Sequence, residues 1–183
     1  MRIITGQARG KRLITLEGRD VRPTGERVKE SLLNILQFSL EGRRFLDLFA
    51  GSGQVGLEAV SRGARQAVLV DSAKASIDVI CQNVKNTGLG ERVQVVQSEF
   101  ESYLLRNDGT FDLCFLDPPY EQGLLQRALP LVSGVMNPGG TIICEHPVTD
   151  ELPETAGDFV RTRSYKYGKI LLTLYRHKEV VEQ

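Results

Sequence analysis

The sequence has few cysteines and no long apolar run, and each shortage excludes a class of protein. Its 183 residues include three cysteines, which lie far apart without a CxxC pair, so neither a disulfide framework nor a metal site is expected. No apolar run approaches the roughly 18 residues that a membrane-spanning helix needs. Residues 1–12 also lack the apolar stretch of a signal peptide. We therefore expect a protein of the reducing cytoplasm with no membrane partner.

An excess of one charge is also absent, because 23 Lys and Arg balance 23 Asp and Glu. The two ends nevertheless differ: residues 1–44 carry ten basic and five acidic residues, against thirteen and eighteen in residues 45–183. The first twelve residues hold Arg2, Arg9, Lys11 and Arg12 and no acid. This basic arm predicts a polyanionic partner, although a merely solvated basic surface is an equal alternative. Because the arm offers little apolar material, we expect its removal to leave the fold intact.

Apolar strands alternate with amphipathic helices from about residue 44, which predicts a doubly wound α/β domain. The 41% hydrophobic content suffices for a full core. Because helices connect the first five strands, we expect these strands to be parallel. Only four residues join the strands expected at 159–165 and 170–176, so these should form an antiparallel C-terminal hairpin. The expected sheet is seven-stranded and mostly parallel. Its first five strands are expected at residues 45–50, 67–71, 93–96, 111–116 and 140–145.

The first 22 residues have a different pattern. Two short apolar stretches, residues 2–4 and 11–14, flank a glycine-containing turn and predict a small N-terminal β-hairpin extension. A helix is expected to follow as far as Leu36. We therefore divide the chain into an extension of residues 1–22 and a main domain of residues 23–183.

A glycine-rich loop, Gly51-Ser-Gly53-Gln-Val-Gly56, follows the first expected strand and opens a helix. Asp71 lies 20 residues after Gly51, at the end of the next strand. This spacing is typical of dinucleotide sites, in which the glycines admit a phosphate and the acid binds ribose hydroxyls. A nicotinamide cofactor is thus one candidate. Asp47, inside the first strand, instead favours a cationic adenosine-containing cofactor, and S-adenosylmethionine carries both an ammonium and a sulfonium.

A second motif, Asp117-Pro118-Pro119-Tyr120, ends the fourth expected strand. Prolines fix the backbone and lack N–H groups, so a rigid turn is the simplest interpretation. It leaves unexplained the acid and the aromatic residue at the sheet edge where ligands bind in such folds. The Asp117 carboxylate and the Pro118 carbonyl would accept hydrogen bonds from the amino group of a base, and Tyr120 would stack on its face. By this chemistry alone the base could be guanine, adenine or cytosine.

Together these motifs resemble the class I S-adenosylmethionine-dependent methyltransferases that act on amino groups of nucleic-acid bases. Arg22-Pro-Thr24, Leu46-Asp-Leu-Phe-Ala-Gly-Ser-Gly53 and Ser61-Arg-Gly-Ala64 are similar to the bacterial 16S rRNA guanine-N2 methyltransferase family. The resemblance implies methyl transfer to a guanine N2 of 16S rRNA, within the small ribosomal subunit or an assembly intermediate. We expect a cytoplasmic monomer with a Rossmann-like fold. The alternatives are another target base, such as adenine N6, or a non-catalytic assembly factor that only binds the cofactor.

The resemblance also assigns roles to individual residues. Catalytic roles fall to Asp117, Pro118, Pro119 and Tyr120. S-adenosylmethionine binding is expected at Asp47, Phe49, Gly51, Gly53, Asp71, Ser72, Glu99 and Phe100. RNA binding is expected at Arg2, Arg9, Lys11, Arg12 and Arg22. Ser98-Glu99 is a departure from the family, in which Gly-Asp is expected at these positions.

Overall fold

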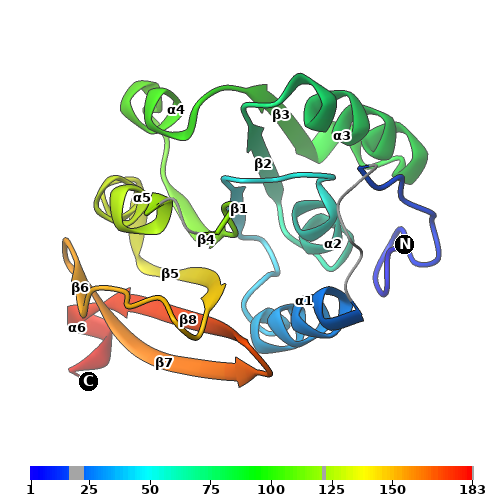
Figure 1. Cartoon of the computed structure of the whole chain (residues 1–183). Coiled ribbons are helices and arrows are strands. Elements are labelled where there is room, and N and C mark those ends of the chain that lie inside the picture. Colours follow the sequence, from blue (N-terminus) through cyan, green and yellow to red (C-terminus); the bar gives the residue numbers. More distant parts are fainter. Residues whose placement is uncertain (17–22, 121–122, 183) are drawn as a thin grey trace.

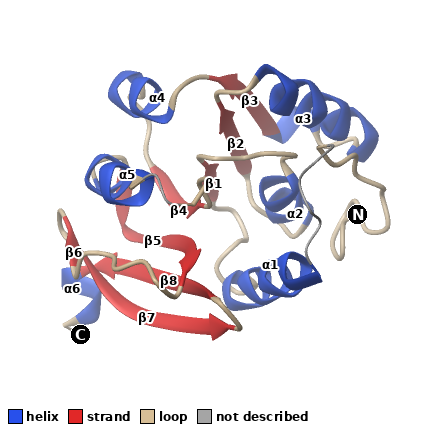
Figure 2. Cartoon of the chain, viewed as in Figure 1, coloured by secondary structure: helices blue, strands red, loops and turns tan. Residues whose placement is uncertain are grey.

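A computed structural model describes residues 1–16, 23–120 and 123–182. In this part of the chain eight strands form one sheet, with the order β3-β2-β1-β4-β5-β8-β7-β6 (Figures 1 and 2). The first five strands are parallel, as expected. They are β1 (Arg44–Asp47), β2 (Gln66–Asp71), β3 (Val93–Gln97), β4 (Phe111–Leu116) and β5 (Met136–Pro147).

The C-terminal hairpin consists of β7 (Phe159–Tyr167) and β8 (Ile170–His177), and it is antiparallel as expected. Strand β8 also pairs antiparallel with β5. This pairing extends β5 past the expected end at residue 145 as far as Pro147, whereas its earlier start at Met136 lies where it pairs with Phe111 of β4. The sheet has eight strands where seven are expected, because β6 (Thr155–Ala156) pairs with the start of β7. A strand of two residues leaves no recognisable sequence pattern.

Helices cover both faces of the sheet (Figure 2). Buried side chains of α1, α2 and α3 pack on one face, and those of α4 and α5 pack on the other. The helices are α1 (Pro23–Leu36), α2 (Gln54–Ser61), α3 (Lys74–Thr87), α4 (Phe100–Arg106), α5 (Leu124–Ser133) and the short α6 (Lys178–Val181), with a 3-10 turn at Gly90–Arg92. None of the helices described is both long and apolar enough to cross a membrane.

The N-terminal segment (residues 1–16) does not form the expected strands. Its hairpin has a single antiparallel bridge, between Arg2 and Arg12. The expectation that this segment buries little apolar surface is also wrong, because Ile3, Ala8 and Leu13 are buried in the core. The proposed division at residue 22 lies outside the described residues and stays a prediction.

A buried carboxylate of α2 anchors this segment. Glu58 is fully buried and accepts hydrogen bonds from the backbone N–H groups of Ile4 and Thr5, both at 2.9 Å. The Arg62 guanidinium donates to the same carboxylate at 3.0 Å. The segment is therefore part of the folded core, and its removal would expose that core.

Candidate functional site

Two loops meet where the strand order reverses. The chain runs from β1 to β2 and β3 at one side of the sheet, then returns so that β4 pairs with the other side of β1. The glycine loop follows β1, and the Asp117–Tyr120 motif follows β4. Parallel sheets bind ligands beyond the carboxyl ends of the strands at such a reversal. The topology thus brings together two motifs that are more than 60 residues apart in the sequence.

The glycine loop requires glycine at two kinds of position. Gly51 and Gly53 have positive φ angles of 58° and 79°, which side chains with a Cβ rarely adopt. At Gly56, in the first turn of α2, a Cβ would lie 2.0 Å from Leu69 Cδ2 of β2. The loop can therefore turn sharply, while the helix behind it packs directly against the sheet.

Asp47 lies beneath this loop. Its side chain is only 1% exposed, and Oδ2 accepts a hydrogen bond of 3.2 Å from the Gly56 N–H. Burial raises the pKa of this carboxyl to about 7. In this position Asp47 supports the loop, and its expected contact with a cationic ligand stays a prediction.

Asp71 holds the loop from the end of β2. One carboxylate oxygen accepts from the Gly51 N–H and the other from the Ala73 N–H, each at 2.9 Å. A carboxylate has about four lone-pair positions, so two remain for the hydroxyls of a ribose. The half-buried position of Asp71 leaves this edge accessible to solvent.

The remaining residues expected at the cofactor lie around the ends of β1, β2 and β3. The rings of Phe49 and Phe100 lie 5.3 Å apart and are tilted by 49°. The Ser72 carbonyl accepts a hydrogen bond from the Gln97 side chain, and Glu99 is exposed immediately before α4. These residues form a partly apolar edge beside Asp71, suitable for a planar base.

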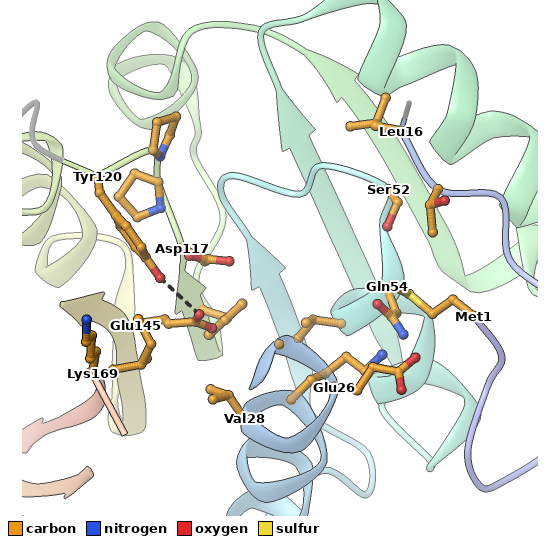
Figure 3. Close-up of a pocket in the computed structure, with 18 of the residues that line it drawn as sticks. Met1, Leu16, Glu26, Val28, Ser52, Gln54, Asp117, Tyr120, Glu145 and Lys169 are labelled. Carbon is orange, nitrogen blue, oxygen red and sulfur yellow. Dashed lines mark hydrogen bonds between the residues drawn. The ribbon is translucent and has the colours of Figure 1, made fainter. Parts of the chain in front are cut away.

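A cavity of about 840 Å³ lies between the two loops, α1 and the N-terminal segment (Figure 3). This volume lies in the range of small-molecule sites. All four residues of the Asp117–Tyr120 motif line it, together with Ser52 of the glycine loop. The described residues that line it include none of the eight expected at the cofactor, which are Asp47, Phe49, Gly51, Gly53, Asp71, Ser72, Glu99 and Phe100.

Glu145, near the end of β5, is a further residue of this site, and no sequence motif marks it. The parallel register of β4 and β5 pairs Leu116 with Cys144. The next residues along the chain, Asp117 and Glu145, therefore lie side by side. The Tyr120 hydroxyl donates to Glu145 Oε1 at 3.4 Å (Figure 3). Burial raises the pKa of this carboxyl to about 7, although the hydrogen bond from Tyr120 opposes the shift.

The adjacent His146 has a different position. It is buried, and Nε2 lies 2.8 Å from the Thr173 hydroxyl of β8. Successive residues of a strand point to opposite faces, and of these two only Glu145 lines the large cavity. These contacts give His146 a structural role in the sheet.

Two buried nitrogen-bearing side chains also line the cavity. Lys29 of α1 is 7% exposed and Gln54 of α2 is 8% exposed. Burial lowers the pKa of Lys29 to about 8, although Glu58, Glu26 and Glu30 partly offset the shift. The Gln54 Nε2 has no hydrogen-bond partner among the described residues. These two side chains provide hydrogen-bond donors suited to an anionic ligand group, and only their burial in the fold identifies them.

The basic residues expected to bind RNA lie on the N-terminal segment, and Arg2, Arg9, Lys11 and Arg12 are all exposed. The same segment reaches the cavity, because Met1, Thr15 and Leu16 line it. The segment that carries the basic residues therefore reaches the wall of the site, although the residues by which it lines the cavity are not basic. Arg22 lies outside the described residues.

Proteins of known structure are similar to this chain in both fold and sequence. The solved structure of yhhF from Escherichia coli, described as a candidate methyltransferase, matches with a TM-score of 0.87 and 33% identity over 97% of both chains. A Thermus thermophilus protein of unassigned function, TTHA0928, matches with a TM-score of 0.80 and 34% identity over 96% of this chain and 99% of its own. The fold is that of the Rossmann-like methyltransferases.

A model of the family described as "Conserved hypothetical protein 95" matches residues 1–176. The relative named ribosomal RNA small subunit methyltransferase D, from Escherichia coli K12, is 33% identical over 97% of this chain and 90% of its own length. The chain belongs to the family of this model, and the Escherichia coli relative resembles the chain in sequence along nearly its whole length.

Proposed function

We propose that the protein transfers the methyl group of S-adenosylmethionine to the N2 amino group of a guanine in the 16S rRNA of the small ribosomal subunit. The observation that carries the proposal is that the Asp117–Tyr120 motif and the glycine loop face one cavity. The name of the Escherichia coli relative supports small-subunit rRNA as the substrate. We further propose that the protein acts as a monomer, on an assembled or assembling ribosomal subunit.

The residues around the glycine loop fit S-adenosylmethionine. Asp71 retains lone pairs for the ribose hydroxyls, and Phe49 and Phe100 offer ring surface beside them for the adenine. The unpartnered Gln54 Nε2 and the buried Lys29 ammonium suit the carboxylate of the methionine end. When bound, this cofactor supplies an electrophilic methyl group on a positively charged sulfur.

The target amine needs help, because its lone pair is delocalised into the base. The Asp117 carboxylate and the Pro118 carbonyl would accept hydrogen bonds from its two N–H groups and direct the lone pair toward the methyl group. Tyr120 would hold the base by stacking, which contributes about 1–3 kcal/mol. The base must leave its stack to reach this corner, as in other enzymes that modify bases. Positioning would then provide most of the acceleration.

The test is methyl transfer from labelled S-adenosylmethionine to 16S rRNA, offered naked and in small-subunit particles, followed by nucleoside analysis. We expect 2-methylguanosine from the wild-type protein. Asp117→Ala should lose most of its kcat, because the carboxylate acts on the base amine, whereas cofactor affinity measured by calorimetry should change little. A different methylated nucleoside, or near-native turnover by Asp117→Ala, would contradict the proposal.

A further inference from the structure

Glu145 is placed to contact the same base as Asp117. Asp117 directly follows β4 and Glu145 lies in the neighbouring parallel strand β5, and the backbones of paired strands lie about 4.8 Å apart. Phe115 and Ile143, two positions earlier in each strand, both pack in the core on the α1 side of the sheet. Because side chains alternate, Asp117 and Glu145 also face the α1 side. Figure 3 shows both side chains at the cavity, and the Tyr120 hydroxyl contacts Glu145.

Two adjacent acceptors distinguish guanine from other bases that carry amino groups. In guanine the N2 amino group adjoins N1–H, so two neighbouring positions of one edge donate hydrogen bonds. In adenine the N6 amino group adjoins N1, and in cytosine the N4 amino group adjoins N3. Both of these ring nitrogens have a lone pair and no hydrogen. Such a lone pair would face a half-buried carboxylate and leave both groups without a hydrogen bond.

We propose that Glu145 accepts a hydrogen bond from N1–H of the target guanine while Asp117 holds the N2 amino group. Glu145 is then a specificity-determining residue that selects guanine over bases whose amine adjoins an unprotonated ring nitrogen. This inference rests on the proposed function and extends it to the basis of base selection. A site built to bind a substrate N–H discriminates strongly against analogues that lack it, because its own polar group is left unpaired.

The test compares guanine with 2-aminopurine, which keeps the 2-amino group but has no hydrogen on N1. The nucleotide methylated in the wild-type assay is first located, and the RNA is then made with either base at that position. We measure kcat/KM at pH 8.5, where the Glu145 carboxyl, with its pKa of about 7, is ionised. The wild-type protein should prefer guanine by about 10- to 100-fold, the range of a hydrogen bond to a charged group.

Glu145→Gln should lower this preference about tenfold or more, because an amide can accept from N1–H or donate to a bare N1. The missing O6 of 2-aminopurine affects wild type and variant alike, so it cancels when their preferences are compared. The control is Glu91→Gln, an exposed residue of the turn before β3, the edge strand that three strands separate from β5. This control should keep the wild-type preference.

An unchanged preference in Glu145→Gln, or an equal loss with both substrates, would overturn the inference and mark Glu145 as structural. If the variant has no turnover, competition binding of the same two RNAs gives its preference for guanine over 2-aminopurine. If calorimetry with S-adenosylmethionine shows that it does not fold, Glu145→Ala, which also removes the acceptor for N1–H, takes its place, and an unchanged preference there also overturns the inference. Failure of the wild-type protein to form 2-methylguanosine would instead contradict the proposed function.

Discussion

The buried carboxylate of Glu58 gives the most direct test of how the N-terminal segment is held. Glu58→Gln keeps the shape of the side chain but removes the charge that accepts from Ile4, Thr5 and Arg62. The amide nitrogen of glutamine would face at least one of these donors. Disrupting one partner of a buried ion pair costs about 3–5 kcal/mol. In a domain of this size each kcal/mol lowers Tm by about 2–4 °C, so a decrease of roughly 6–20 °C is expected.

The matched control is Glu101→Gln. Glu101 also pairs with an arginine, Arg127, but 39% and 54% of these side chains are exposed. Exposed ion pairs contribute about 0–1 kcal/mol, so this variant should melt within about 4 °C of the wild type. Thermal unfolding followed by circular dichroism measures both variants. Equal Tm values for the two would refute the argument that the Glu58 contacts hold the segment in the core.

Three further outcomes are expected. Asp71→Ala should weaken S-adenosylmethionine binding by about 1.5–3 kcal/mol in calorimetry, and an unchanged affinity would contradict the ribose assignment. Asp47 has a pKa of about 7 in the folded protein, above its ordinary value of 3.8. Its protonated form therefore stabilises the folded state below about pH 4, and this contribution is lost as the pH rises to about 7. The free energy of unfolding, measured with urea and without cofactor, should therefore fall less between pH 4 and 7 for Asp47→Asn than for the wild type. Parallel pH profiles for the two proteins would contradict the burial of the Asp47 charge. Replacing the four basic residues of the N-terminal segment by Gln should preserve the fold. It should reduce the slope of log K for RNA binding against log salt by roughly 0.7–0.9 for each lost phosphate contact, or up to about three units in all. An unchanged slope would mean that these residues only face solvent.

The parallel core could be predicted because its strands are continuous apolar runs separated by amphipathic helices. Residues 111–116, for example, are a strand in both the prediction and the structure. The Asp117–Tyr120 motif was recognisable because its residue types and its position after a buried strand both indicate a ligand edge. These features are local in the sequence, and local pattern is what a single sequence contains.

The features that were missed depend on contacts between distant residues. Ile3, Ala8 and Leu13 follow no strand or helix period, and their segment is held by Glu58 and Ser61, about 50 residues away. Glu145 was overlooked because the face to which it points follows from the register between β4 and β5. That register is a property of the assembled sheet, and a one-residue shift would have placed His146 there instead.

The strand order has a consequence for the time at which the site forms as the chain folds. Phe45 of β1 pairs with Leu113 of β4, 68 positions later in the sequence, and β2 and β3 lie between them in the chain. Such distant pairings require closure of a long loop and are intrinsically slow. The glycine loop can be built from β1, α2, β2 and α3, whose Asn83 donates to the Ser52 carbonyl, whereas the Asp117 corner requires β4 to dock beside β1. A partly synthesised chain would therefore complete the cofactor loop before the base-binding corner, and the ability to methylate RNA would be among the last properties that folding delivers.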